Sequence, residues 1–140
     1  MKLTKQDEEL IEIAREVVLK NSDIYNDPSM HVGCAVRAKS GKVYIGVNLK
    51  TSHSVCAEQV AIGQAYACGE RALDSIVAVK MDKEGKTRVV SPCGLCRYIF
   101  EKFGLNLNVV VEDIENKKIL KVSSDKLLPY PYKREDKLNK

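Results

Sequence analysis

The sequence predicts a single α/β domain in which helices pack on one sheet. Helical and strand-like patterns alternate along the chain, which is the order typical of this fold class. The length of 140 residues lies near the modal size of one domain, and 44% hydrophobic with 30% charged residues is an ordinary globular composition. A chain of this size can build its own core, so it needs no disulfide or metal in order to fold.

The first half is expected to hold a helix, a strand hairpin and a second helix. Thr4 followed three residues later by Asp7 is typical of a helix start, and apolar residues then recur at helical spacing. Ser40-Gly41 separates two apolar runs and indicates a hairpin. In order, we expect a helix with its apolar face at 10–18, a loop at 21–29, strands at 32–38 and 42–47, a loop at 50–55 and a helix from 56 to about 69.

The second half repeats the alternation. The β-branched run at 75–81 is typical of a buried strand, and Ser91-Pro92 precedes a helix that Gly104 ends. In order, we expect a strand at 75–81, a turn at 84–85, a helix at 93–103, strands at 107–111 and 118–122 with a turn at 115–116, and a short helix at 127–129. The domain is expected to cover 1–132, and 133–140 to be a charged C-terminal tail.

Charge and apolar patterning exclude several function classes. The net charge of +4 comes from 23 basic and 19 acidic residues without a long basic run, so we expect no nucleic-acid partner. The polar start resembles no signal peptide, and no apolar stretch is long enough to span a membrane, so we expect no membrane partner and a cytoplasmic location. In that reducing compartment the five cysteines are expected to be metal ligands or buried thiols.

Three cysteines and one glutamate form a pattern with a chemical meaning. Cys93 and Cys96 are three residues apart at a helix start, so their side chains point to the same side, and Cys56 begins another helix. Three thiolates from two helix N-termini can hold zinc and leave its fourth position open. Glu58, two residues after Cys56, is placed to transfer protons. The pattern matches the zinc deaminase signature in its all-cysteine form.

Two other interpretations of this pattern stay open at this point. Cys93 and Cys96 alone could form a redox pair. Alternatively, His53, three residues before Cys56, could complete a closed structural zinc site in a binding protein that does no chemistry. Cys34 and Cys68 are expected to be buried thiols.

The motifs at 56–58 and 92–97 resemble those of the cytidine deaminase family, and the resemblance covers roughly residues 10–132. It implies a three-layer α-β-α sandwich with a mixed five-stranded sheet, a bound Zn²⁺ and a homotetramer with active sites near subunit contacts. By resemblance, Cys56, Cys93 and Cys96 are the zinc ligands and Glu58 is the proton shuttle. The reaction implied is hydrolytic deamination of a cytosine nucleoside.

Within the family, the chain resembles the blasticidin S deaminase type. That resemblance rests on residues 46–48, the short loop before Cys56, and the run 127–129 followed by Tyr132. It implies that the substrate is cytidine, deoxycytidine or an antibiotic of the blasticidin S type. Asn48 resembles the family's sugar contact and Tyr132 the C-terminal aromatic residue that closes the pocket. His31 is a further candidate for substrate contact.

The sequence departs from the family pattern at three positions. Lys50 stands where cytidine deaminases place a glutamate that holds ribose, and its ammonium group favours an anionic substituent instead. Gln59 replaces an arginine that offsets thiolate charge, a role that Arg97 is expected to take in part. Leu95 stands where the blasticidin-type enzyme has an arginine.

Overall fold

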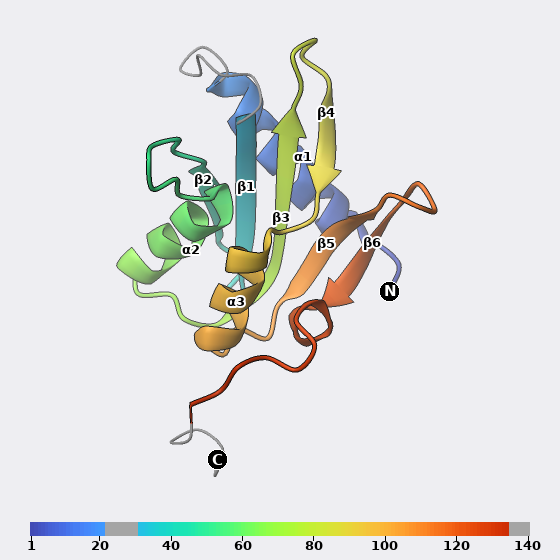
Figure 1. Cartoon of the computed structure of the whole chain (residues 1–140). Helices are drawn as coiled ribbons and strands as arrows, with labels where there is room; N and C mark the ends of the chain where they lie inside the picture. Colours follow the sequence, from blue (N-terminus) through green and yellow to red (C-terminus); the bar gives the residue numbers. More distant parts are fainter. Residues whose placement is uncertain (22–30, 135–140) are drawn as a thin grey trace.

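The computed structural model describes residues 1–21 and 31–134. In this part of the chain, helices and strands alternate much as the sequence predicts (Figure 1). The elements in chain order are α1 (Lys5–Lys20), β1 (His31–Ala38), β2 (Val43–Val47), α2 (Ala57–Ala67), β3 (Leu73–Met81), β4 (Thr87–Val90), α3 (Gly94–Lys102), β5 (Asn108–Asp113), β6 (Lys118–Ser123) and the 3₁₀ helix η3 (Ser124–Leu127).

The sheet is mixed and branches at β3. Its main path has the strand order β2-β1-β3-β5-β6, and β4 pairs with β3 beside this path. The β3–β5 pair is parallel, whereas the other pairs are antiparallel. The described sheet therefore has six strands rather than the five expected, and the extra strand is β4.

Helices cover both faces of the sheet, which confirms the three-layer architecture. In Figure 1, α2 and α3 lie in front of the sheet and α1 lies behind it. Successive residues of a strand point to opposite faces. In β1, Cys34 and Val36 accordingly join the apolar cluster under α2 and α3, while Ala35 joins the cluster under α1.

Two glycines allow the helices to approach the sheet closely. A Cβ atom at Gly46 would lie 2.5 Å from the Ala61 nitrogen and 2.6 Å from the Ala57 carbonyl oxygen, both in the backbone of α2. On the other face, a Cβ at Gly33 would lie 2.6 Å from the Ala14 carbonyl oxygen of α1. The absence of a side chain at Gly46 thus seats α2, the helix that follows Cys56, directly on β2.

A buried carboxylate fixes the start of α1. Thr4 and Asp7 form the capping box that the sequence predicts. Asp7 is fully buried and accepts a hydrogen bond from the Lys121 ammonium at 2.8 Å, and the Arg37 guanidinium lies 3.6 Å away. Asp7 therefore joins α1 to β6 and β1 through charged groups.

Three expectations about the backbone need comment. The expected short helix at 127–129 is instead η3, because Ser124 bonds the backbone at Leu105 and Leu107 and so starts the turn earlier. The loop expected at 21–29 lies outside the described residues from 22 onward. Among the described residues, no helix has the length and apolar character that membrane crossing requires.

Candidate metal centre and active site

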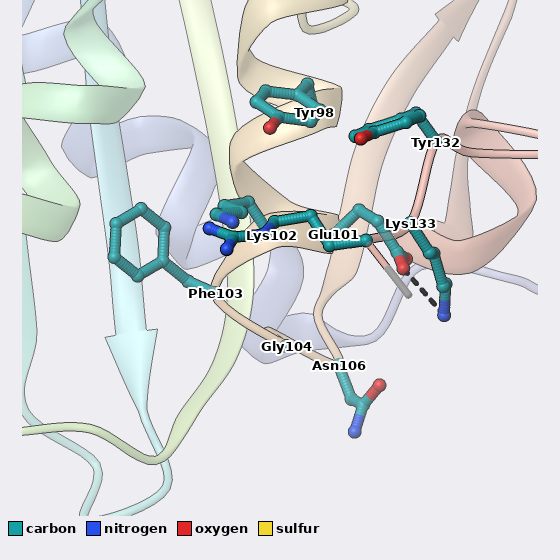
Figure 2. A pocket seen from close by; sticks show the side chains of 9 residues that line it. Tyr98, Glu101, Lys102, Phe103, Gly104, Asn106, Tyr132 and Lys133 are labelled. Atoms are coloured by element: carbon teal, nitrogen blue, oxygen red, sulfur yellow. Dashed lines mark ion pairs between the residues drawn. The ribbon is translucent and has the colours of Figure 1, made fainter. Parts of the chain in front are cut away.

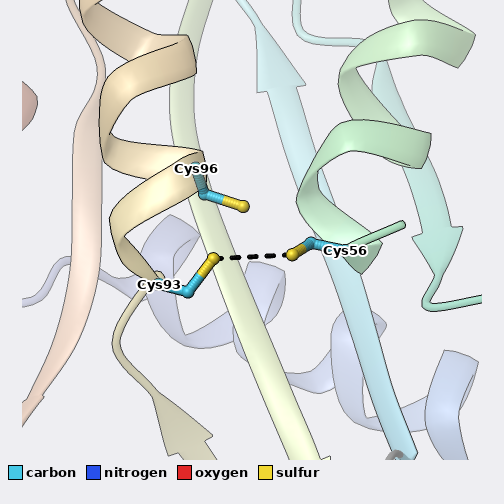
Figure 3. A group of neighbouring side chains, drawn as sticks. All are labelled: Cys56, Cys93 and Cys96. Atoms are coloured by element: carbon cyan, nitrogen blue, oxygen red, sulfur yellow. Dashed lines mark hydrogen bonds between the residues drawn. The ribbon is translucent and has the colours of Figure 1, made fainter. Parts of the chain in front are cut away.

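Three cysteine sulfurs meet where α2 and α3 begin (Figure 3). Cys56 is the N-cap of α2, Cys93 is the N-cap of α3, and Cys96 lies in the first turn of α3. The Sγ atoms of Cys56 and Cys93 are 3.5 Å apart, and all three sulfurs lie within 4.8 Å of one another. Neither N-cap thiol is used to cap its helix, so both can face a shared ligand.

The spacing of the sulfurs fits a zinc ion. Three sulfurs each about 2.3 Å from a tetrahedral zinc lie about 3.8 Å from one another. The observed separations, from 3.5 Å up to at most 4.8 Å, bracket that value. Both helices also present the N-terminal end of their dipoles, which favours thiolate ligands. The cluster is therefore suited to Zn²⁺ bound by three cysteines.

The surroundings shift the pKa values of the three thiols in different directions. Burial, and then the hydrogen bond with Cys93, raises the pKa of Cys56 to about 11. Burial also raises the pKa of Cys96 well above its ordinary value. At Cys93 burial acts in the same direction, but the backbone N–H of Cys96 and the thiol of Cys56 outweigh it, so the pKa of Cys93 lies below its ordinary value. The surroundings therefore shift the pKa of Cys93 in the opposite direction from those of Cys56 and Cys96.

Glu58 lies beside the cluster in the first turn of α2. Its side chain is only 7% exposed, and burial raises the pKa of the carboxyl above its ordinary value despite hydrogen bonds from its own backbone and from Cys96. A carboxyl group with a raised pKa is suited to accept and return a proton near neutral pH.

His53 does not belong to the cluster. Among the described residues, the group of possible metal ligands contains only the three cysteines. The His53 side chain is exposed, and its Nδ1 atom lies 3.2 Å from the Ser52 hydroxyl. The structure therefore favours an open site with three protein ligands over the closed site that includes His53.

The two remaining cysteines lie elsewhere. Cys34 is buried in β1, as expected. The expectation for Cys68 is wrong, because it is exposed as the C-cap of α2, where the helix ends at the surface.

A cavity of about 160 Å³ opens onto the cluster. Glu58, Cys56 and Cys93 line it together with Asn48, which follows β2. Asn48 is buried, and its side-chain oxygen accepts a hydrogen bond from the Val32 N–H at 3.0 Å. The remaining lining residues are mostly apolar: Val32, Ser54, Val55, Ala57, Val90 and Ser91. The cavity thus combines apolar walls with a few fixed polar groups, as small-molecule sites do.

The other expected substrate contacts lie apart from this cavity within the described chain. Tyr132 is 77% exposed and lines a different cavity of about 490 Å³ on the outer side of α3. Figure 2 shows Tyr132 beside Tyr98 there, with the ion pair between Lys133 and Glu101 below the two rings. His31 is buried at the start of β1, and Lys50 is exposed in the loop after β2.

Two residues that hold the segment before α3 were not singled out for this role by the sequence. The hydroxyl of Ser91 bonds the backbone of Glu112 in β5. The Arg97 guanidinium donates to the carbonyl oxygens of Pro92 at 2.8 Å and Leu127 at 3.3 Å. Arg97 therefore ties backbone segments together. No sequence signal indicates either contact, since each depends on tertiary structure.

Comparisons with known proteins agree with this geometry. Residues 4–112 match the family model described as "Cytidine and deoxycytidylate deaminase zinc-binding region". Blasticidin-S deaminase of Bacillus cereus is 36% identical over 139 residues, which cover 94% of this chain and 96% of that protein. A probable cytidine deaminase of Dictyostelium discoideum is 32% identical and covers 78% of this chain and 73% of its own.

Solved structures show the same fold. Cytidine deaminase from Burkholderia pseudomallei, 28% identical, superposes with a TM-score of 0.70 over 93% of this chain and all (100%) of that chain. The enzyme from Bacillus anthracis, 18% identical, superposes with a TM-score of 0.72 over 89% of this chain and 88% of its own, and at that identity it supports the fold alone. This chain therefore belongs to the cytidine and deoxycytidylate deaminase family and is a zinc-dependent deaminase.

Proposed function

We propose that this protein hydrolyses the exocyclic amino group of a cytosine nucleoside or nucleoside antibiotic and releases ammonia. The observation that carries the proposal is the meeting of three cysteine sulfurs and the buried Glu58 carboxyl at one cavity. The similarity to proteins named blasticidin-S deaminase and cytidine deaminase supports this substrate class.

Each group has a distinct part in the reaction. Cys56, Cys93 and Cys96 would hold zinc, which when bound would supply Lewis acidity and lower the pKa of its bound water to about 7. The Glu58 carboxylate takes one proton from water and delivers it to N3 of the cytosine ring as oxygen adds to C4. It then passes the second proton to the amino group, the C4–N bond breaks and ammonia leaves. The product is the uracil base, so all atoms of water and substrate are accounted for.

Substrate contacts beyond the base are proposed from the loop after β2. Asn48 lines the cavity, and in this proposal it holds the sugar. The loop that follows is closed by two hydrogen bonds between Leu49 and Val55, both 3.0 Å. Lys50 lies in this loop, and Ser54 of the same loop lines the cavity. An ammonium group on this loop would favour a carboxylated sugar, such as that of blasticidin S, over plain ribose.

We further propose that the enzyme acts as a cytoplasmic homotetramer with a single domain over 1–132 and a short charged tail. The exposure of Tyr132 supports a subunit contact. Tyr132 does not line the cavity at the cysteine cluster of its own chain, so its ring could close an active-site pocket only in a second copy. His31, at the start of β1, is retained as a candidate substrate contact.

Ammonia release from cytidine, deoxycytidine and blasticidin S tests the proposal. We expect all turnover to require zinc, and blasticidin S to have a higher kcat/KM than cytidine. Lys50→Glu should shift this ratio toward cytidine, and Lys83→Glu, an equal charge change in an exposed turn, should not. If none of the three compounds is deaminated, the proposed function is refuted. An unchanged ratio in Lys50→Glu would refute only the role of Lys50.

A further inference from the structure

We infer that Ser91 is a positioning residue of the metal site, because its hydroxyl group locks the segment before Cys93 onto strand β5. Ser91, Pro92 and Cys93 connect β4 to α3. Ser91 and Cys93 both line the cavity at the cysteine cluster. The catalytic part of this inference rests on the proposed function, whereas its effect on metal retention does not.

The sheet forks next to Ser91. Strand β3 pairs with β5 through Ser75 and Ile76, and from Ala78 onward it pairs with β4 instead. In the described part of the chain, no backbone ladder joins β4 to β5. A strand that leaves its neighbour presents backbone N–H and C=O groups that need other partners. The C-terminal half of β5 therefore needs other hydrogen-bond partners on the edge that faces β4.

The Ser91 hydroxyl bridges the fork. It donates a hydrogen bond to the Glu112 carbonyl oxygen at 3.2 Å and accepts one from the Glu112 N–H at 3.2 Å. In a regular antiparallel pair, a facing residue would supply both bonds from its backbone. One side chain therefore replaces a missing rung of the sheet. An ion pair between Arg88 and the Glu112 carboxylate, 2.7 Å long, crosses the same fork, but Arg88 is exposed and such pairs contribute little.

Glu58 lies beside the fork as well as beside the cysteine cluster. A small cavity of about 10 Å³ lies between the strands of the fork and α3, and Glu58 lines it as well as the larger cavity. Val90 and Pro92, the sequence neighbours of Ser91, line the small cavity too. Its volume is near the lower limit for one water molecule. Opening the fork would enlarge the space beside the Glu58 carboxyl and loosen the backbone that carries Cys93.

Ser124 offers a matched control, since its hydroxyl makes the same two-way bridge elsewhere. It donates to the Leu105 carbonyl oxygen at 2.8 Å and accepts from the Leu107 N–H at 3.1 Å. Ser124 lines neither the small cavity nor the larger one. Removing either hydroxyl deletes two hydrogen bonds to the backbone, so both changes should lower folding stability. Only the change at Ser91 should alter the metal site.

The test compares zinc-loaded Ser91→Ala and Ser124→Ala with the unchanged enzyme. We measure the melting temperature, the rate of zinc release to a chromogenic chelator, and kcat and KM. One hydrogen bond corresponds to about a tenfold change in an equilibrium or rate. We therefore expect Ser91→Ala to release zinc about tenfold faster and to lose about tenfold in kcat, with KM changed less than about threefold. Ser124→Ala should melt earlier yet match the unchanged enzyme in zinc release and kcat.

A second pair of variants keeps the test decisive if Ser91→Ala does not fold. Threonine and valine have nearly the same shape, but only threonine has a hydroxyl group. Ser91→Thr should retain slow zinc release, and Ser91→Val should release zinc rapidly. Equal release from these two variants, or release from Ser91→Ala no faster than from Ser124→Ala, would overturn the inference. If the proposed function fails, the unchanged enzyme shows no turnover, while the zinc-release comparison still gives its answer.

Discussion

Replacing Asp7 with asparagine removes the buried negative charge that joins α1 to the sheet. Asp7 is 0% exposed and bonds Lys121, whose side chain is 13% exposed, at 2.8 Å. Breaking a buried ion pair by removing one partner costs about 3–5 kcal/mol. Asparagine keeps a side-chain oxygen that can accept the hydrogen bond from the Thr4 N–H, which in the unchanged protein is 2.8 Å long. We therefore expect the free energy of unfolding to fall by about 3 kcal/mol at pH 7, the lower end of that range.

The same substitution should change how stability depends on pH. Burial raises the pKa of Asp7, but hydrogen bonds from Lys121 and Thr4 outweigh burial and hold the pKa below its ordinary value. A carboxyl whose pKa is depressed in the folded state stabilises the fold above its unfolded pKa of about 3.9. That contribution is lost as the pH falls through the lower, folded pKa. Asp7→Asn should therefore show a shallower loss of stability below about pH 4.

Urea unfolding from pH 2 to 7 measures both effects. Asp74→Asn is the matched control, because Asp74 also pairs with Arg37, at 3.1 Å, but is 36% exposed. A partly exposed pair contributes about 0–1 kcal/mol, so this variant should lose little. The reasoning is refuted if Asp7→Asn loses no more stability than Asp74→Asn, or if its acid dependence equals that of the unchanged protein.

Two further predictions concern the active site. Glu58→Gln should keep its zinc and its fold yet lose about 10²–10⁴-fold in kcat, because glutamine cannot transfer a proton. Zinc analysis, circular dichroism and ammonia release measure these three properties. Undiminished turnover would contradict the role of Glu58. Cys93→Ala should lose zinc, because a ligand is gone, whereas His53→Ala should retain it, because His53 lies outside the cluster. Metal analysis of the two purified variants distinguishes these outcomes, and zinc loss from His53→Ala would restore the closed-site interpretation.

Most of the fold could be predicted because the local patterns agree with it. The capping box at Thr4 and Asp7 and the helix and strand order need only short-range information. Strand β4 could not be predicted, since its four residues include the charged Arg88 and their strand geometry comes from pairing with β3. The expected helix after β6 was displaced for a similar reason, namely the long-range bonds of Ser124.

The metal site could be predicted from the sequence more fully than the substrate site. Zinc ligands need fixed spacing at helix starts, so Cys93 and Cys96 are visible in the sequence and the third ligand follows from the motif. Substrate contacts depend on how loops meet in space, and the structure brings Asn48 to the cavity but leaves Tyr132 on another surface. The Ser91 bridge was invisible because Glu112 is 21 residues away.

The placement of the candidate metal ligands at the starts of two separate helices has a mechanical consequence. Cys56 belongs to α2 and Cys93 to α3, so a metal ion held between them acts as a cross-link within one helical layer. Its removal by a chelator would leave the first turns of both helices without their common anchor, and amide hydrogen exchange should accelerate there first. Helix α1, on the opposite face of the sheet, shares no ligand with the ion and should keep its protection. Metal loss would therefore loosen the helical layer on one face of the sheet and would not cause general unfolding.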